Sequence, residues 1–285
     1  MKKYCLLLVV LCLAFIIQDA NSSLLKTHQI TPTRYEINIA TIPDALAKDI
    51  GVGADGTMWR ISNSPEWANF AIYRLKPNAT AWDKVQGQAM RVSVCPDSLA
   101  WVVTYEKRVF KWNPTFGRWD IYVDYGGPGG VDVSCSPDGN AYYVGDDGSL
   151  YMLNKDNTTF KKLQGNGICI AGGLCQSAWY LGNDKQIYKT LPGGWKTIAG
   201  QATDVAVGAN GQTWILTTDA APNQFAVWDE KKETLVTVPV AAHLATSGQS
   251  FSNSPTVRIA VAPNGDLIGV KEDATMFRMS FKYTL

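Results

Sequence analysis

The sequence predicts an all-β fold: a six-bladed β-propeller of four-stranded antiparallel blades, with the last blade closed by an N-terminal strand. A short motif recurs six times along the 285 residues, and its last position falls at Trp59, Trp101, Tyr142, Trp179, Trp214 and Ile268. Repeats of about 40 residues with strand-type alternation are typical of propeller blades. The 11% aromatic residues, 25 Gly and 13 Pro also suit short strands joined by tight turns.

Each copy of the motif predicts the inner strand of a blade and the turn that follows it. The clearest copies are Asp49–Trp59 and Asp204–Trp214, and the most eroded is Cys169–Trp179. Alternate positions of the strand are apolar and are expected to point into the packing between blades. The Asp-Gly or Asn-Gly pairs that end in Gly56, Gly139, Gly211 and Gly265 are hairpin signals that require positive φ.

Two further strands follow the motif in each copy. Each third strand is centred on an aromatic residue: Tyr73, Phe110, Tyr151, Tyr188, Trp228 and Phe277. The fourth strands carry Trp82, Trp119, Phe160, Trp195 and Leu235. The sixth copy has no clear fourth strand, so we expect the alternating segment Tyr35–Ile42 to supply it and to close the ring, which removes two sheet edges.

The chain divides into an N-terminal targeting segment and one domain. Residues 1–22 are basic, then apolar, then small and polar, which is typical of a secretory signal peptide cleaved after Ala20 or Ser22. The alternative is an uncleaved anchor, although the apolar run is shorter than a bilayer span requires. Residues 23–34 form an N-terminal lead, and 35–285 the propeller, with a loop insertion at 243–255. We therefore expect a secreted protein, outside the cell or at its surface.

Four cysteines follow the predicted cleavage site, and they allow three pairings. Cys135 falls at a core position, where we expect a buried thiol, and the pattern requires no disulfide. Cys169 and Cys175 lie at opposite ends of one predicted strand, which holds them too far apart to bridge. The pairing of Cys95, Cys135, Cys169 and Cys175 therefore stays open.

Strand order assigns the loops to two faces of the propeller. The sequons at Asn78 and Asn157 lie in turns between third and fourth strands, so N-glycosylation would crowd one face. The other face collects the longer loops, and binding residues concentrate in loops on rigid scaffolds. There we expect Trp67 to be exposed, and we include Trp67 and Tyr125 among the candidate ligand-binding residues.

Polar residues open the predicted inner strands and would form a collar at the mouth of the channel on the same face. They are Asp49, Arg91, Asp132, Cys169, Asp204 and Arg258. This collar is a candidate site for a charged ligand or an ion. The alternative, which we favour, is a set of ion pairs such as Asp49–Arg91–Asp132.

Several functional classes lack support in the sequence. A net charge of +1 provides no basic face for nucleic acid. Only two His are present, without a nucleophile elbow or Cys/His metal spacing, so we expect no enzyme, no cofactor and no metal site. Gly51–Gly56 matches a dinucleotide fingerprint but leads into a strand instead of a helix. Gly145–Gly148 lacks the spaced ligands of a calcium loop, so a plain turn is expected.

The repeat unit resembles the tectonin family, as in Trp195–Trp214, Asp49–Trp59 and the Ile-Tyr-Arg/Lys segments that end at Arg74 and Lys189. The resemblance covers residues 35–285. It implies a β-propeller lectin related to tachylectin-1 and fish-egg lectins, with glycans or a glycosylated surface as partners. Tyr142 and Ile268 stand where Trp is usual, so the resemblance does not imply six equivalent sugar sites or particular binding residues.

Three functions are consistent with these observations. The first is a secreted lectin that binds a microbial or cell-surface glycan without calcium, through loops on one propeller face. The second is a structural or protein-interaction component of an extracellular or cell-surface assembly. The third is a secreted hydrolase or lyase, which would need a cluster of carboxylates or His at the channel mouth.

Overall fold

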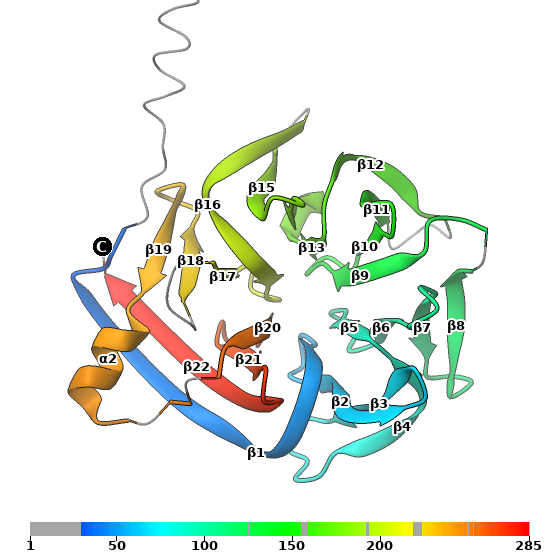
Figure 1. The fold of residues 1–285 in the computed structure, drawn as a ribbon, viewed down its shortest axis with the longest axis horizontal. Coiled ribbons are helices and arrows are strands. Elements are labelled where there is room, and N and C mark those ends of the chain that lie inside the picture. Colours follow the sequence, from blue (N-terminus) through cyan, green and yellow to red (C-terminus); the bar gives the residue numbers. More distant parts are fainter. Residues whose placement is uncertain are drawn as a thin grey trace, which may run out of the picture.

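The computed structural model describes residues 30–284 except 125, 155–158, 192–193, 219–223, 250 and 253, and it leaves out the side chains of residues 44 and 191. The expected signal peptide, most of the lead, Tyr125 and Asn157 lie outside the described residues. The strands are antiparallel and arranged in a ring, with β5, β9, β13 and β20 nearest its centre (Figure 1).

Two of the sheets have four strands each. One contains β5 (Arg91–Val94), β6 (Ala100–Val103), β7 (Val109–Asn113) and β8 (Arg118–Val123). The next contains β9 (Gly130–Cys135), β10 (Ala141–Gly145), β11 (Ser149–Leu153) and β12 (Lys161–Asn166). In both sheets consecutive strands pair, so each sheet is a meander that runs outward from the centre of the ring.

The other two sheets have seven strands each. The first contains β20 (Thr256–Val261), β21 (Leu267–Lys271), β22 (Thr275–Thr284), β1 (Arg34–Val52), β2 (Met58–Glu66), β3 (Asn69–Leu75) and β4 (Asp83–Ala89). The second contains β13 (Cys169–Gly172), β14 (Ala178–Leu181), β15 (Gln186–Leu191), β16 (Gly194–Val207), β17 (Thr213–Thr217), β18 (Phe225–Asp229) and β19 (Thr234–Val238).

Each seven-stranded sheet consists of two four-stranded units that share one long strand. β1 pairs with β22 as far as Leu46 and with β2 from Ala47 onward. β16 likewise pairs with β15 as far as Gln201 and with β17 from Ala202. The result is an all-β, propeller-like arrangement of antiparallel four-stranded units.

The expected closing strand is confirmed. Tyr35–Ile42 lies within β1 and pairs with β22, with Tyr35 opposite Tyr283 and Ile42 opposite Met276. The segment before it also reaches the neighbouring unit, because Ile30 exchanges backbone hydrogen bonds with Leu235 (2.9 Å) and Thr237 (2.8 Å) beside β19. The N-terminal end of the described chain therefore contacts two units.

The core lies in layers between neighbouring units. In one layer Trp59 and Ile72 from one unit cluster with Val92 and Val102 from the next, and all four side chains are buried. Burial of apolar surface is the main driving force for folding. The layers bury the repeated aromatic position at Trp59, Trp101, Tyr142, Trp179 and Trp214.

The Arg or Lys of the Ile-Tyr-Arg/Lys segments, and Lys111 at the equivalent position of Val109–Lys111, each have a cross-strand partner. Arg74 lies opposite Trp59, Lys111 opposite Trp101 and Lys189 opposite Trp179. Each cation lies 5.2–5.7 Å from the centre of its partner ring. This is within the range of cation–π attraction, so the repeated basic residue stabilises the repeated indole.

The expected turns are present at the four glycines that end the motif turns. Gly56 has φ +87° and donates its backbone N–H to the carbonyl of Gly53 (3.0 Å). Gly139, Gly211 and Gly265 have φ between +81° and +89°. The turn at Gly145–Gly148 is also a plain turn, because both carboxylate oxygens of Asp147 bind Ser149 (2.8 Å each).

The expected loop insertion at 243–255 is wrong for its first part, which belongs to the helix α2 (Val240–Ser247) at the rim of the ring (Figure 1). Ala and Leu are strong helix formers, and the helix ends at Gly248, whose φ of +68° suits a C-terminal cap. Buried Val240 and half-buried Leu244 attach α2 to the core. A short 3₁₀ turn, η1 (Leu174–Gln176), also interrupts the strands.

The expectation of a buried free thiol at Cys135 is wrong. Cys135 is disulfide-bonded to Cys95, with their Cα atoms 5.0 Å apart, and the bond joins the β5–β8 and β9–β12 sheets. One sequence repeat separates the two cysteines, but they lie on adjacent units, which brings them into range. Cys169 (buried) and Cys175 (exposed) are free, so the prediction that they do not pair is confirmed.

Candidate functional site

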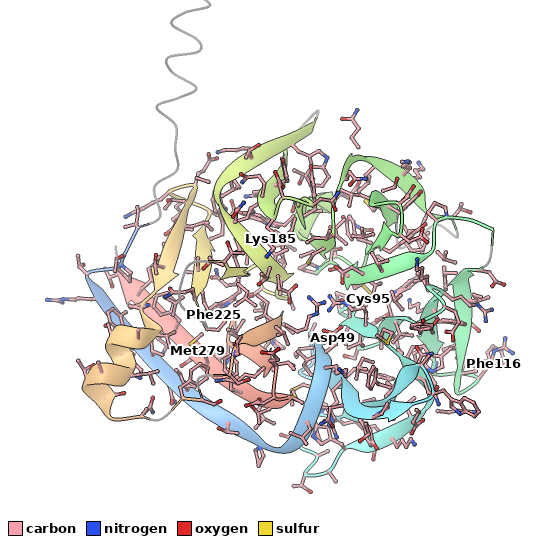
Figure 2. All side chains as sticks on the ribbon, in the orientation of Figure 1. Asp49, Cys95, Phe116, Lys185, Phe225 and Met279 are labelled. Carbon is pink, nitrogen blue, oxygen red and sulfur yellow. A yellow bond between two sulfur atoms is a disulfide. The ribbon has the colours of Figure 1, made fainter. Side chains whose placement is uncertain are left out.

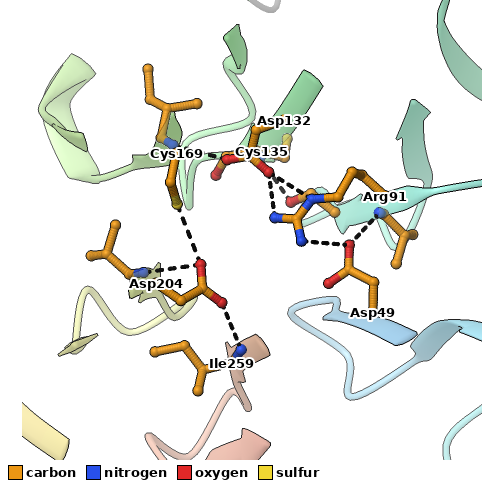
Figure 3. Close-up of polar contacts among 12 residues, drawn as sticks. Asp49, Arg91, Asp132, Cys135, Cys169, Asp204 and Ile259 are labelled. Atoms are coloured by element: carbon orange, nitrogen blue, oxygen red, sulfur yellow. Dashed lines mark hydrogen bonds and ion pairs between the residues drawn. The ribbon is translucent and has the colours of Figure 1, made fainter. Parts of the chain in front are cut away.

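Five of the six collar residues, all except Arg258, converge at the centre of the ring, where the inner strands begin (Figure 3). Asp49, Asp132 and Asp204 are only 2–3% exposed, and Cys169 is 4% exposed. Arg91 has a side chain 14% exposed. The charged part of the collar is therefore inside the channel, below its mouth.

Arg91 forms the ion pairs that we favoured from the sequence. Its Nη1 lies 3.5 Å from an oxygen of Asp49, and its Nε donates a 2.9 Å hydrogen bond to Asp132, which also accepts a hydrogen bond from Nη2. The three side chains come from the inner strands of three successive units. Two carboxylates flank the guanidinium, so the buried positive charge is compensated.

Each collar carboxylate also holds the backbone of the next unit. Asp49 accepts the N–H of Val92 (2.8 Å), Asp132 that of Ile170 (2.9 Å) and Asp204 that of Ile259 (2.8 Å). Two serines repeat this arrangement further along the channel: Ser93 accepts the N–H of Cys135 and Ser134 that of Gly172 (3.0 Å each). The collar carboxylates therefore connect neighbouring sheets through hydrogen bonds.

Burial dominates the acid–base behaviour of the cluster. It raises the pKa of Asp49 to about 6, against the opposing effect of Arg91, and that of Asp204 to about 7. Burial also raises the pKa of the Cys169 thiol, and the charges of Asp132 and Asp204 raise it further. The Cys169 sulfur lies 3.3 Å from an oxygen of Asp204, at the side of the cluster away from Arg91 (Figure 3).

Above the collar, the mouth of the channel opens into a depression of about 800 Å³. Its wall includes Lys48, Asn63, Arg91 and Arg258, and Arg258 is half-buried at the start of β20. In the described part of the chain, Arg258 takes no part in the ion pairs of the cluster. The structure thus separates Arg258 from the other collar charges.

Trp67 has the most exposed large apolar side chain among the described residues, at 97%. It lies in the two-residue loop between β2 and β3, where Glu66 and Asn69 form the last strand pair. Its φ is +60°, at a hairpin position where glycine is favoured. Side chains that accept such backbone strain cluster at functional sites. The prediction that Trp67 is exposed is confirmed.

A polar groove lies at the base of this hairpin, with a volume of about 690 Å³. Glu66 pairs with Lys84 (2.6 Å) and accepts a hydrogen bond from Gln88 (3.0 Å). The Lys84 and Gln88 bonds lower the pKa of Glu66, so its carboxylate stays charged. The groove therefore offers hydrogen-bond donors and acceptors beside an exposed indole.

Sequence reasoning missed a second exposed aromatic residue on the same face. Tyr105 is 62% exposed in the β6–β7 loop, which corresponds to the β2–β3 loop of the preceding unit. Asn69 joins the two loops, because its side chain accepts the N–H of Tyr105 (2.7 Å) and donates to Glu106 (3.3 Å). The position of Tyr105 between a second and a third strand was the available signal.

The other predicted site residues divide between the opposite face and the undescribed part of the chain. Asn78 is exposed in the β3–β4 turn with φ +63°, on the face away from Trp67. Tyr125 and Asn157 lie outside the described residues. Within the described ranges, no group of three His, Cys, Asp or Glu side chains is placed to hold a metal ion. Likewise, no helix described there is long and apolar enough to cross a membrane.

The fold resembles several solved propeller-like structures. A streptogramin B lyase superposes with a TM-score of 0.56 at 12% identity, covering 87% of this chain and 98% of the lyase. A protein of unknown function from Bacteroides thetaiotaomicron gives a TM-score of 0.63 at 10% identity, covering 87% of this chain and 77% of that protein. YCF48 bound to a D1 peptide gives 0.57 at 10% identity, with 90% and 100% covered.

These identities are too low to transfer an activity, and they show a shared fold alone. No curated protein sequence matches this chain. The family model of the Tectonin domain matches residues 47–237, which is more than half of the chain. The matched span includes the indole–cation pairs, the collar from Asp49 to Asp204 and the hairpin of Trp67. The chain therefore belongs to the tectonin family.

Proposed function

We propose that this protein is a secreted lectin, a six-bladed tectonin-like propeller that binds a microbial or cell-surface glycan through the loops on one face. The observation that carries the proposal is Trp67, almost fully exposed on a strained hairpin tip. A flat aromatic ring stacks on the apolar C–H face of a sugar. Glu66, Lys84 and Gln88 in the adjacent groove are suited to binding the sugar hydroxyls.

We also propose that the protein binds without catalysing a reaction and without a cofactor. The buried carboxylates of Asp49, Asp132 and Asp204 each accept a backbone N–H from the next unit. A carboxylate in this role holds the scaffold together, and with only 2–3% of its surface exposed each of these side chains has little contact with the mouth of the channel. This supports a rigid binding platform at the mouth in preference to a hydrolase or lyase site.

Secretion is proposed on three features. Residues 1–22 have the pattern of a signal peptide, and the Cys95–Cys135 disulfide suits an oxidising compartment. Asn78 begins an N-glycosylation sequon and is exposed. A glycan there would lie on the face away from Trp67 and would leave the ligand face open. The sequon at Asn157 is proposed as a second glycosylation site.

The alternative function is that of a protein-interaction component of an extracellular assembly. It is favoured by apolar residues around the channel mouth, each directly before a collar position: Val131 (39% exposed), Ile168 (42%) and Val257 (36%). Exposed apolar patches mark protein interfaces. On this reading Trp67 would contact a protein partner.

A glycan array with purified protein tests the proposal. We compare the wild type with Trp67→Ala and with a control, Phe116→Ala. Phe116 is 67% exposed at the rim of the ring (Figure 2). It lies in the β7–β8 turn, between a third and a fourth strand, and therefore on the face opposite Trp67. We expect wild-type binding that a soluble sugar abolishes, and a loss of about tenfold or more in affinity for Trp67→Ala only.

If folded wild-type protein binds no glycan on the array, the lectin proposal is contradicted. The alternative would then be tested with the double variant Val131→Asp, Ile168→Asp, which places charges on the apolar ring around the mouth. If the alternative holds, this variant fails to assemble on the surface of the secreting cells, while Phe116→Ala assembles normally.

A further inference from the structure

The depression at the mouth of the channel is a second candidate site, apart from the groove beside Trp67. Its wall includes residues of five inner strands, which surround the axis of the ring in Figure 1: Lys48 of β1, Arg91 of β5, Val131 of β9, Thr203 of β16 and Arg258 of β20. The groove, in contrast, is lined by residues of β2–β4 and the loops that join them. A ligand in the depression would therefore lie over the channel and contact several units at once.

Two cations of this wall have no carboxylate partner among the described residues. Arg258 is half-buried at the start of β20, and its guanidinium forms no ion pair or hydrogen bond within that part of the chain. None of its nitrogens belongs to the buried polar atoms that lack a partner, so the guanidinium is open to solvent. Lys48 is exposed, and its ammonium lies 4.6 Å from the centre of the Phe70 ring, which positions the charge without neutralising it. Both charges are therefore available to an anionic group in the depression.

The end of β21 and the turn after it add three charged residues to the wall, and two of them are held by the fold. Lys271 is 3% exposed, and its ammonium donates to the carbonyl of Ser252. The carboxylate of Asp273 accepts the N–H (3.0 Å) and the hydroxyl (2.6 Å) of Thr275. Glu272 is exposed and would repel an anionic ligand, so the effect of its substitution has a predicted sign.

The rim of the depression is aliphatic. Val131 and Val257, on β9 and β20, are 39% and 36% exposed, and half-buried Met90 directly precedes β5. None of the described residues in the wall is aromatic, so a sugar ring has no flat surface there on which to stack. Exposed apolar groups beside unpaired cations suit a ligand that carries both aliphatic side chains and carboxylates. A peptide can carry both, whereas an acidic glycan supplies only the carboxylates.

We propose that the mouth of the channel binds an acidic peptide segment of a partner protein that is also rich in aliphatic residues. One carboxylate of the peptide accepts two hydrogen bonds from the guanidinium of Arg258, and a second pairs with Lys48. Leu or Val side chains of the peptide pack on Val131 and Val257. This adds a partner of stated chemistry to the protein-interaction function considered above. It does not depend on glycan binding, because the groove beside Trp67 shares no residue with the depression.

An array of short synthetic peptides, probed with the purified protein, tests the proposal. One set combines Asp and Glu with Leu and Val in all orders, a second replaces the acids by Asn and Gln, and a third replaces Leu and Val by Ser. We expect the array to retain protein on members of the first set. In solution, fluorescence anisotropy should show about tenfold weaker binding, or less, for their counterparts in the other sets. Failure of the whole first set, or equal binding of the neutral counterparts, would overturn the proposal.

Single substitutions at the mouth then localise the binding. Arg258→Gln should weaken the peptide affinity about tenfold, because a ligand carboxylate loses its bidentate partner, and Arg258→Lys should restore part of it. Val257→Ser should also weaken it, through lost apolar contact. Glu272→Gln should strengthen it about twofold, because a like charge is removed. The control is Arg118→Gln, at a side chain 67% exposed on β8, which should bind like the wild type. Equal losses for the Arg258→Gln and Arg118→Gln variants would overturn the site.

Two crossed measurements distinguish failure of this site from failure of the proposed function. Trp67→Ala should bind the retained peptides like the wild type, and Arg258→Gln should keep the glycan binding of the wild type. A protein that binds glycans but none of the acidic aliphatic peptides overturns the peptide site and leaves the lectin proposal standing. Hyaluronan oligosaccharides, which carry carboxylates without aliphatic side chains, are the competing ligand. If they bind more tightly than the peptides, and in a way that depends on Arg258, the proposed ligand class is wrong.

Discussion

The β5–β8 sheet has two neighbours, the β1–β4 strands on one side and the β9–β12 sheet on the other. The two interfaces, called seams below, use the same repeat positions in different ways. At the seam with the β1–β4 strands, Trp59 donates its indole hydrogen to Ser98 and closes the gap. At the seam with the β9–β12 sheet, Trp101 has no such partner, a cavity takes the place of the contact, and the Cys95–Cys135 disulfide joins the sheets. The same repeat position therefore forms a hydrogen bond between sheets in one copy, at Trp59, and part of a cavity wall in the next, at Trp101.

The comparison also indicates what stabilises the seam that contains the cavity, between the β5–β8 and β9–β12 sheets. Asp49 accepts the backbone N–H of Val92 at the first seam, and Ser93 accepts that of Cys135 at the second. Arg91 pairs with both Asp49 and Asp132. Only the second seam has a covalent bond. The disulfide stabilises the packing where an indole hydrogen bond is missing, so the cavity does not require a loose interface.

The largest expected effect comes from Arg91, which contacts both seams. Arg91→Met leaves two buried carboxylates without their cation, so we expect a loss of about 5 kcal/mol in unfolding free energy, the upper part of the range for broken buried ion pairs. Urea unfolding followed by tryptophan fluorescence at pH 7 measures it. The control is Arg118→Met, whose side chain is 67% exposed. A loss below about 1 kcal/mol would contradict a fastening role.

Removal of the disulfide should weaken the seam that contains the cavity. Cys95 and Cys135 are 40 residues apart, and releasing a loop of that length costs about 4 kcal/mol in the chain-entropy model. We expect the double variant Cys95→Ala, Cys135→Ala to unfold at correspondingly lower urea concentration. Cys175→Ala, at an exposed free thiol, is the control and should unfold like the wild type. Equal midpoints for all three proteins would disprove the role of this bond.

The buried carboxyl groups of Asp49 and Asp204 should make the unfolding free energy depend on pH. The pKa of Asp49 is about 6 and that of Asp204 about 7 in the folded protein, against about 4 when unfolded. The folded state binds more protons between pH 4 and 7, so the unfolding free energy falls as the pH rises through this window. From pH 5 to 7.5 we expect a loss of about 4 kcal/mol.

Asp204→Asn tests the origin of that slope, because Asp204 has the larger pKa shift and does not pair with Arg91 in the described structure. The variant should lose the part of the slope near pH 7 and keep the part near pH 6, which belongs to Asp49. A slope unchanged by the substitution would assign the pH dependence to other groups.

The smallest expected effect compares the two indoles directly. Trp59→Phe removes a hydrogen bond to Ser98, whereas Trp101→Phe removes a donor that has no partner. Both variants lose similar apolar volume. Trp59→Phe should therefore be the more destabilising by about 1 kcal/mol, the net value of one hydrogen bond. A larger loss for Trp101→Phe in urea unfolding would show that its N–H is satisfied in solution.

The fold was predictable because repetition constrains it strongly. The spacing of Trp59, Trp101 and Trp179 predicted the units, and the alternation in Tyr35–Ile42 predicted the closing strand. Helix α2 was missed because a short run of Ala and Leu inside an insertion resembles any apolar loop. The disulfide was missed because Cys95 and Cys135 lie at different positions of their repeats, and pairing across a seam depends on tertiary geometry.

The candidate site was only partly predictable. Trp67 stood out because it broke the repeat, and its exposure is confirmed. The collar was predicted at the mouth of the channel, and the structure buries its charged part below the mouth, with the favoured ion pairs and with backbone anchors. The ring of Trp101 is buried in the core. That its N–H lacks an acceptor depends on the position of a turn in the next unit, which no single repeat encodes.

The pairing of β1 with β22 sets the order of events during synthesis. Arg34 pairs with Thr284, so one of the first strands to leave the ribosome gains its partner only when the last is made. Until then the nascent chain exposes two unpaired strand edges, which are the surfaces that promote misassociation. Ring closure is therefore a late step of high contact order, and we expect it to limit the folding rate.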